Sequence, residues 1–477
     1  MSTAIVWLRR DLRLQDNPAL QAALADHAQV LPVHIHAPHE EAPWVPGAAS
    51  RWWLHHSLAA LDADLRARGA RLHIARGDSL QSLQALIAAS GARAVYWNRL
   101  YEPAVLARDT HIKQQLRAQG TDAHSSNAAL LVEPWQVFSG EGRPYRVFTP
   151  FWRAARAQMV LREPLEAPSH IAMPQVAGSL PLDALGLLPR IAWDSGLQAS
   201  WKPGAAGARA QLARFLDSAL SGYHEWRDVP GTAGTSRLSP HLHFGEIGPQ
   251  QVIAALHANT ARYRACHAAA ASEHYVRELG WREFSHHLLY HFPHTPEANL
   301  NAAFDGFDWQ HADAATLARW QQGRTGIPIV DAGMRELWHT GWMHNRVRML
   351  VASFLTKNLR LHWLHGARWF WDTLVDADLA NNTQGWQWSA GSGADAAPYF
   401  RIFSPSAQSA RFDAQGAYIR RWVPELTDVP APLLFEPWKD AALLKRCNYP
   451  VPLTDLADSR AAALAAYRRL RSDAPSH

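Results

Sequence analysis

The sequence is poor in cysteine, with only Cys266 and Cys447 among 477 residues and no CxxC pattern. Neither a disulfide framework nor a thiolate metal site is therefore indicated. Long hydrophobic runs are also missing, since none reaches the roughly 18 to 20 residues that a membrane span needs. At the N-terminus a short apolar run precedes the arginines of MSTAIVWLRRDLRLQD, the reverse of the order in a signal peptide. We expect a cytoplasmic enzyme with no membrane partner and no metal.

A glycine-rich dinucleotide-binding loop is missing as well. Residues 1–130 alternate strand and helix patterns, and this alternation predicts a parallel, doubly wound sheet. The first strand is followed by LRRDLRLQDNP and not by GxGxxG, so ordinary dinucleotide binding is not indicated. We predict strands at 4–9, 29–36, 70–75 and 92–98, and helices at 18–25, 50–68, 79–89 and 105–119.

The pattern changes twice further along the chain. From about residue 128 to residue 202 it breaks into Pro, Gly and short apolar pieces, which indicates a long connector. After Trp201 helical periodicity dominates, with helices predicted at 249–259, 269–290, 314–322 and 330–340. We predict an α/β plus all-α fold: a Rossmann-like, five-stranded parallel sheet in residues 1–130, a linker over 131–200 and a helical domain over 201–477.

Tryptophan, by contrast, is abundant, with 22 in the chain and several between Gly341 and Phe403. A buried indole N–H needs a hydrogen-bond partner. The Asp376/Asp378 and Asn381/Asn382 pairs in this stretch need partners too. This combination predicts a polar ligand enclosed by aromatic walls. The net charge of +5 and the pI of 9.3 favour a polyanionic partner.

Three short motifs place polar groups at helical spacing. Asn345 and Met349 are four residues apart and share one helix face, as do Glu278 and Trp281, which are three apart. A Gly-Thr-Ser run at 234–236, ahead of a helix, offers hydroxyls and free N–H groups to a phosphate. Structural alternatives stay open at this point: a buried amphipathic helix, a solvated helix face and a simple helix cap.

Seven motifs occur in one order along the chain: LRRDLRLQDNPAL, GTSRLSP, ELGWREF, GWMHNRVRM, DADLANN, GWQW and YFRIFSP. In order and spacing they resemble the photolyase/cryptochrome family over nearly the whole chain. Residues 46–61 and 370–379 resemble its bacterial branch nearest to plant cryptochromes, class III. The resemblance implies a helical domain that binds FAD, fully reduced in the active form. It also implies light-driven electron transfer to a cyclobutane pyrimidine dimer (CPD) flipped out of DNA.

The resemblance also implies which residues contact FAD. At the position of Asn382, a neutral amide faces the flavin's central ring and can donate or accept as the flavin charge changes. A carboxylate there would disfavour the reduced anion. The implied phosphate and ribityl contacts are Tyr223, Thr235, Ser236, Arg237, Leu238 and Ser239, and the implied isoalloxazine contacts are Arg348, Asp376, Ala377, Asp378 and Asn382.

Two further sets of roles follow from the same resemblance. Trp309, Trp363 and Trp386 match a relay that carries electrons from the surface to FAD, with Trp369 or Trp371 as alternative members. The partner is UV-damaged DNA, single- or double-stranded, bound without sequence preference by a monomer, because backbone contacts give affinity without reading bases. Trp281 and Trp388 match the walls around the dimer, Glu278, Asn345 and Met349 match its other contacts, and Arg282, Arg346 and Gln408 match contacts to the DNA backbone.

Family members with other functions differ at these positions. Enzymes that repair (6-4) photoproducts carry His at the positions of Asn345 and Met349. Plant cryptochromes carry Asp at the positions of Asn345 and Asn382 and Tyr at that of Trp388. This chain has the CPD-repair residue at each of these four positions. CPD repair is therefore favoured, and a cryptochrome-type photoreceptor with little or no repair is the alternative.

The antenna chromophore is the least determined part of the resemblance. Many folate-binding relatives have Asn-Glu shortly after a Tyr-Glu pair, but here Tyr101-Glu102 is followed by Pro-Ala-Val. Glu40 or Glu41 could take over this contact. So could the aromatic residues Phe148, Phe151 and Trp152, which could equally pack the linker onto the sheet. We favour a methenyl-folate over a deazaflavin, and a protein without an antenna is the third alternative.

Overall fold

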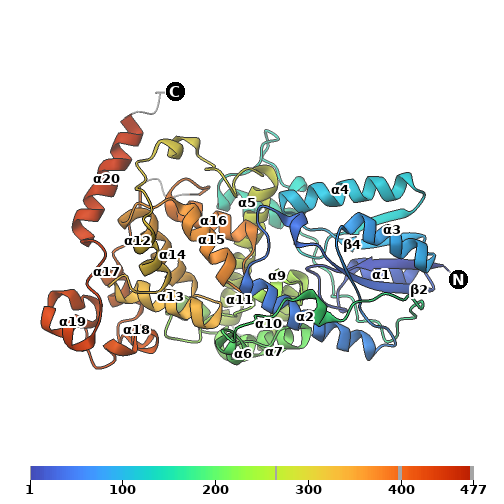
Figure 1. Ribbon diagram of the computed structural model, residues 1–477, viewed down its shortest axis with the longest axis horizontal. Coiled ribbons are helices and arrows are strands. Elements are labelled where there is room, and N and C mark those ends of the chain that lie inside the picture. The colour runs from blue at the N-terminus through green and yellow to red at the C-terminus, as the bar shows by residue number, and fades with distance from the viewer. Residues whose placement is uncertain (1, 264–265, 396–399, 473–477) are drawn as a thin grey trace.

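The computed structural model describes residues 2–263, 266–395 and 400–472 (Figure 1). Tyr399, which opens the YFRIFSP motif, lies outside these residues. The N-terminal part holds a five-stranded sheet in the order β3-β2-β1-β4-β5, with every neighbouring pair parallel. The predicted parallel sheet is therefore confirmed. Its strands are β1 (Thr3–Trp7), β2 (Gln29–His36), β3 (His73–Arg76), β4 (Ala94–Asn98) and β5 (Asp122–Ser126).

Helices cover both faces of this sheet (Figure 1). Side chains alternate across a strand, so Ala4 and Val6 of β1 pack with α1 and α2, whereas Ile5 and Trp7 pack with α3 and α4. All five residues of β1 are buried, as expected for a strand covered on both sides. The four helices are α1 (Pro18–Asp26), α2 (Ala48–Arg66), α3 (Ser79–Ser90) and α4 (Pro103–Ala118), each within two residues of its predicted bounds.

Two elements could not be located from their sequence patterns. Among the described strands β5 pairs with β4 alone, and its sequence, Asp-Ala-His-Ser-Ser, contains no apolar run. The connector contains α5 (Phe148–Gln158), which buries Phe148, Phe151 and Trp152. These aromatic residues pack against α11 of the helical domain and not onto the sheet. The other short elements of the connector are η2 (Pro134–Gln136), η3 (Leu182–Leu185) and α6 (Ser195–Ser200).

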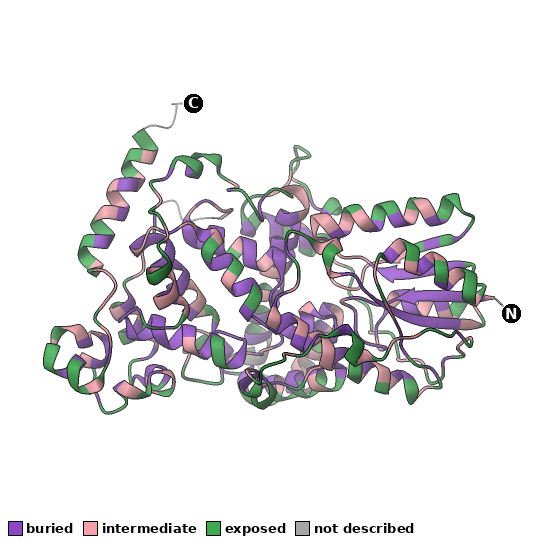
Figure 2. Ribbon diagram, viewed as in Figure 1, coloured by how far each residue is buried: buried purple, intermediate pink, exposed green. Residues whose placement is uncertain are grey.

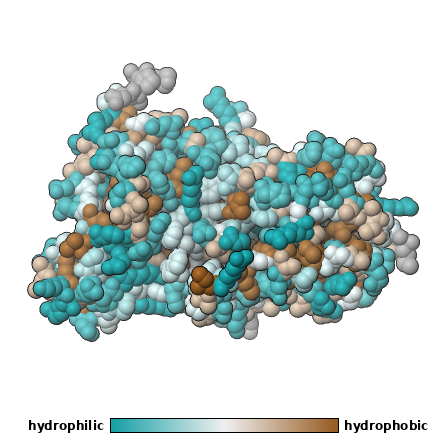
Figure 3. Space-filling view, viewed as in Figure 1, coloured by the Kyte–Doolittle hydropathy of each residue, from teal (hydrophilic) through white to brown (hydrophobic). Residues whose placement is uncertain are grey.

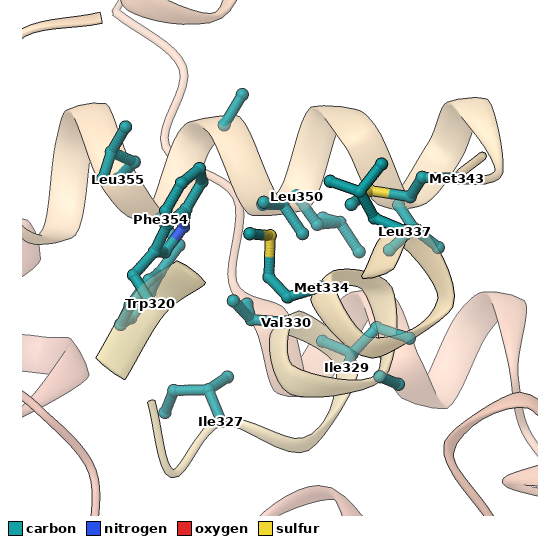
Figure 4. Packing of buried hydrophobic residues seen from close by; sticks show 14 of the residues in the cluster. Trp320, Ile327, Ile329, Val330, Met334, Leu337, Met343, Leu350, Phe354 and Leu355 are labelled. Carbon is teal, nitrogen blue, oxygen red and sulfur yellow. The ribbon is translucent and has the colours of Figure 1, made fainter. Parts of the chain in front are cut away.

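The chain after Trp201 is helical, as predicted. Its largest hydrophobic cluster lies around α13 and α14, where Met334 and Leu337 face Leu350 across the helix pair (Figure 4). Gly341 ends α13 with a φ of +66°, a conformation that favours glycine, and so lets the chain turn directly toward α14. The α-helices are α7 (Ala205–Arg214), α8 (Tyr223–Trp226), α9 (Ser239–His243), α10 (Pro249–Tyr263), α11 (Cys266–His291), α12 (Ala314–Gln321), α13 (Pro328–Thr340), α14 (Asn345–Ser353), α15 (Trp363–Thr373), α16 (Leu379–Ala390), α17 (Pro405–Phe412), α18 (Ala417–Trp422), α19 (Ala441–Cys447) and α20 (Leu456–Ser472).

Buried polar contacts join the sheet domain to the rest of the chain. Trp53 of α2 donates its indole N–H to Glu246 Oε1 at 2.9 Å. Arg13, which is 2% exposed, donates to the Gly245 carbonyl at 2.8 Å. Buried residues continue through this junction in Figure 2. Each hydrogen bond satisfies a polar group that would otherwise be costly to bury, so the junction is a specific interface.

The face of the molecule seen in Figure 3 is mainly hydrophilic. In the view of Figure 3, hydrophilic side chains cover most of the face, with hydrophobic ones in small groups between them. Within the described residues, no helix is both long enough and apolar enough to cross a membrane.

Candidate cofactor and DNA site

One cavity of about 570 Å³ brings together residues from α11, α14 and α16 and from the segment that leads into α16. The helices meet because α16 packs on α11, on α14 and on α15. Twelve of the residues predicted from the sequence line this single space. They are Glu278, Trp281, Asn345, Arg346, Arg348, Met349, Asp376, Ala377, Asp378, Asn382, Trp386 and Trp388.

The N-terminal turn of α14 forms one wall. His344 caps this helix by accepting a hydrogen bond from the Arg346 backbone N–H at 3.2 Å. Asn345 and Met349 then follow one turn apart, and both line the cavity. The helix face predicted from their spacing is therefore the face that borders the ligand space.

Arg348 and Asp376 form a fixed ion pair on the same wall. The Arg348 guanidinium donates to both Asp376 carboxylate oxygens, at 3.1 and 2.8 Å, and its Nε donates to the Met343 carbonyl at 2.7 Å. The Asp376 side chain is only 3% exposed. Both Asp376 oxygens accept from one guanidinium nitrogen, Nη2, and the Nε bond to Met343 holds the guanidinium in orientation. A charge-assisted pair held in this way suits recognition of a polar ligand edge.

Asp378 is the N-cap of α16. Its carboxylate accepts from the Asn381 backbone N–H at 2.9 Å, and the His243 and His286 rings each lie 3.5 Å from its other oxygen. Burial alone would raise the pKa of Asp378, but the two histidines hold that pKa well below its usual range. The lowered pKa favours the charged carboxylate beside the cavity.

Asn382 lies one turn further along α16 and is 9% exposed. Its side-chain nitrogen donates to the Ala367 carbonyl of α15 at 3.0 Å. This hydrogen bond fixes the amide and leaves its oxygen as the group that can accept from a ligand.

The predicted phosphate contacts lie beside this cavity and not among its lining residues. Arg237, with a φ of +52°, lies between the Trp201 ring, 4.3 Å away, and the Trp342 ring, 4.9 Å away. Within the described part of the chain, its buried Nε has no hydrogen-bond acceptor. Ser239 is exposed and accepts from the Trp342 indole at 3.3 Å. A cation with an orphaned donor beside an exposed hydroxyl fits the phosphates of FAD.

Other members of this group have structural contacts. The Ser236 hydroxyl accepts from the Tyr275 hydroxyl at 2.8 Å. Leu238 is fully buried in the core, so only its backbone could contact a ligand. Tyr223 is 5% exposed and packs edge-on against Tyr275. Thr235 is half-buried. The sequence motif therefore mixes positions that can reach a ligand with positions that support them.

The three relay tryptophans lie in or against one hydrophobic cluster. Trp386 lines the cavity and is 2% exposed, and Gly366 packs so closely that a Cβ there would lie 2.0 Å from the Trp386 ring. Trp363 is fully buried and donates to Asn299 at 2.9 Å. The His362 ring contacts both Trp363, at 5.5 Å between centroids, and the partly buried Trp309, at 5.1 Å.

The alternative tryptophans occupy different places. Trp369 stacks on Trp338, with ring centroids 6.0 Å apart and planes 6° apart, and Trp338 is 60% exposed. Trp371 instead donates to the Val45 carbonyl at 2.7 Å and contacts the Trp44 ring. Trp369 therefore leads toward solvent, whereas Trp371 packs against the sheet domain.

The residues predicted to contact DNA are not all at the cavity. Trp281 and Trp388 line it, and Trp281 is stacked from behind by Phe148 at 3.7 Å. Gln408 lies outside the lining on α17, where its buried Oε1 has no partner among the described residues. The structure does not bring Arg282 to the cavity, because its guanidinium donates to the Ala129 carbonyl at 2.7 Å and lies close to Glu283.

Three charged lining residues received no role from the sequence, namely Arg227, Asp228 and Asp395. Arg227 pairs with Glu278 at 2.5 Å, and Asp228 pairs with Arg346 at 2.8 Å. The sequence feature that could have indicated Arg227 and Asp228 is the adjacent Arg-Asp dipeptide four residues after Tyr223. Spacing along the chain could not reveal the pairing, since the partners lie on α11 and α14.

Comparison with known proteins supports the family resemblance that the sequence motifs indicated. Residues 4–169 match the family model described as DNA photolyase, and residues 275–469 match the FAD binding domain of DNA photolyase. A deoxyribodipyrimidine photo-lyase of Agrobacterium fabrum is 46% identical, with 98% of each chain covered. Cryptochrome-1 of Arabidopsis thaliana is 37% identical over 96% of this chain and 69% of its own length.

A solved structure is equally close. The crystal structure of a bacterial class III photolyase from Agrobacterium tumefaciens superposes with a TM-score of 0.93 at 45% identity, over 99% of this chain and 98% of that one. Sequence motifs, fold and relatives therefore agree. This chain belongs to the photolyase/cryptochrome family.

Proposed function

We propose that this protein is a deoxyribodipyrimidine photo-lyase that binds FAD and splits CPDs in DNA under light. One observation carries the proposal. The residues predicted to contact the dimer border the same cavity as those predicted to contact the isoalloxazine; they are Glu278, Trp281, Asn345, Met349 and Trp388. The relatives named photo-lyases, at 46% identity and below, support this reading.

The chain's own groups fit the cofactor. Arg348 with Asp376, the charged Asp378 and the fixed amide of Asn382 would hold the isoalloxazine, and Arg237 with Ser239 would hold the phosphates. When bound in its reduced form, FAD supplies the light-excited electron that opens the cyclobutane ring and then takes it back. The protein positions the two partners and excludes water between them.

The substrate half of the site is rigid. Phe148 covers the back of Trp281, so a dimer can stack on only one face of that indole. Trp388 is held by its N–H, which donates to the Asp395 carbonyl at 3.2 Å. Arg227 orients Glu278 at 2.5 Å. A flipped dimer would thus meet preset walls, which reduces the ordering cost of binding.

The electron supply to FAD would run through Trp386, Trp363 and Trp309. Trp386 borders the cavity and belongs to the same hydrophobic cluster as Trp363. The His362 ring joins Trp363 to Trp309, which is partly exposed. The stacked pair Trp369 and Trp338 offers a second route to solvent.

An antenna is proposed in the sheet domain, with methenyl-folate as the favoured chromophore. Glu40 is already engaged, because it accepts from Ser79 and pairs with Arg108. Glu41 instead lines a cavity of about 90 Å³ together with Glu102, Trp44 and Trp371, and its carboxylate lies 3.9 Å from Arg10. Glu41 and Glu102 are therefore the acids that this cavity offers to a ligand. An absorption band near that of a folate or of a deazaflavin in purified protein distinguishes the two chromophores.

A light-dependent assay tests the function. Oligonucleotides containing a thymine dimer are incubated with dithionite-reduced protein, and the recovery of thymine absorbance is followed in light and in darkness. We expect thymine absorbance to recover only in light. We also propose that the protein acts as a monomer in the cytoplasm. A protein that binds FAD and changes its redox state in light, yet restores no thymine, would instead be a cryptochrome-type photoreceptor.

A further inference from the structure

The arginines that line the cavity are all neutralised within the protein. Arg227 pairs with Glu278, Arg346 with Asp228 and Arg348 with Asp376. A site for a polyanion would be expected to leave cations free for phosphates. Of these three acids, Asp376 is buried, but Asp228 is 31% exposed in its side chain and so meets solvent and any approaching strand.

Asp228 occupies a central place in this arrangement. It follows α8 and reaches Arg346 of α14 at 2.8 Å, while its other oxygen lies 4.0 Å from Arg227 Nε. Arg227 in turn holds Glu278 of α11. Burial lowers the pKa of the adjacent His344 to about 4, so this ring adds no charge at neutral pH. Two cations and two anions thus alternate along one wall.

We infer that Asp228 is a specificity-determining residue that occupies Arg346 in place of a DNA phosphate until a flipped dimer brings that phosphate into the cavity. This inference rests on the proposed function. A carboxylate and a phosphate offer Arg346 similar paired acceptors, so one can replace the other at little net cost. Undamaged duplex keeps its bases stacked and presents its backbone phosphates only at the rim of the cavity, where the Asp228 carboxylate competes with them for Arg346, so Arg346 stays with Asp228.

The consequence is that damaged DNA gains one phosphate contact that undamaged DNA does not. Each such contact steepens the salt dependence of duplex binding by about 0.9 in log–log slope. Between 50 and 200 mM salt, one contact therefore changes affinity about threefold. In the wild type, binding of dimer-containing duplex should be steeper than binding of undamaged duplex by this amount.

The test is Asp228→Asn, measured by fluorescence anisotropy with matched damaged and undamaged duplexes from 50 to 200 mM salt. The variant frees Arg346 in the absence of a lesion. We expect its slope on undamaged duplex to rise by about 0.9, to the value for damaged duplex, so that the ratio of the two affinities no longer changes about threefold between 50 and 200 mM salt. FAD absorbance in the purified variant confirms that it is folded.

Glu225→Gln is the matched control. It removes the same charge three residues earlier, from a side chain that is 69% exposed and pairs only with His224 among the described residues. Its slopes should match those of the wild type. In an Arg346→Gln background, Asp228→Asn should no longer change the slope on undamaged duplex.

Three results would overturn the inference: an unchanged slope in Asp228→Asn, an equal change in Glu225→Gln, or a change that persists without Arg346. Each can be scored while the wild type still splits dimers in light. Failure of dimer splitting by the wild type would instead refute the proposed function.

Discussion

Substitutions of Trp386 and of Trp388 should impair different functions, although the two residues lie only two positions apart. Trp386 is assigned to electron supply, and Trp388 to the wall of the dimer site. If both were only core residues, replacing either would unfold the protein and release FAD. Conservative replacement of each by Phe, which retains most of the apolar volume, distinguishes these readings.

The structure sets the cost of each change. Trp386 is 2% exposed and packed against Gly366, Phe370 and Trp320, so Trp386→Phe leaves a small cavity worth about 1 to 2 kcal/mol. Trp388 is half-buried, and Trp388→Phe loses one hydrogen bond to the Asp395 carbonyl, worth about 1 kcal/mol. Both costs are small beside a typical stability of about 5 to 15 kcal/mol.

Both variants should therefore purify with FAD. Trp386→Phe should lose photoreduction of oxidised FAD, measured by transient absorption, but split dimers normally after reduction by dithionite. Trp388→Phe should photoreduce normally but bind or split dimers less well. Equal losses of both properties in the two variants would refute the separation of roles.

Three further predictions follow from the ion pairs and from burial. Arg346→Ala should weaken binding of damaged DNA in a titration but leave the yield per bound dimer unchanged; a fall in that yield would contradict its backbone role. Arg348→Met strands the buried Asp376 charge, so thermal unfolding should show a loss of about 3 to 5 kcal/mol together with reduced FAD content. Burial raises the pKa of Glu283 from 4.5 to about 7. The contribution of Glu283 to the free energy of unfolding is therefore full below pH 4.5 and is lost as pH rises through 7. Glu283→Gln should remove this decline of roughly 3 kcal/mol in urea unfolding, and an unchanged pH slope would exclude Glu283 as its source.

The regular elements could be predicted because their residues repeat at the period of the structure. The helix face of Asn345 and Met349 followed from a spacing of four, and the strands of the sheet followed from apolar runs. β5 could not be located because an edge strand with one buried residue has no such run. α5 could not be located because it lies in a connector rich in Pro and Gly, and its aromatic residues are buried by packing against α11, which is distant in sequence.

The candidate site, too, could be predicted only in part from the sequence. The motifs indicated twelve of the residues that line the cavity, but they carried no information on which charged side chains pair with each other. Asp228 and Arg346 are far apart in sequence, and their ion pair depends on how α8 and α14 pack. Arg282 sits in a motif with Glu278 and Trp281, and the motif did not indicate that its guanidinium donates to the Ala129 carbonyl. Its contact with the DNA backbone stays a prediction.

The indole of Trp53 has a consequence for how the protein is made. Its acceptor, Glu246, lies 193 residues later in the chain. At synthesis rates of about 5 to 20 residues per second, the ribosome exposes α2 for about 10 to 40 s before that carboxylate exists. During this interval the sheet domain presents Trp53 and Arg13 without the partners that later bury them. The nascent chain therefore exposes one side of the domain junction before the other side is synthesised. Chaperones that bind aromatic surfaces have this period in which to protect it.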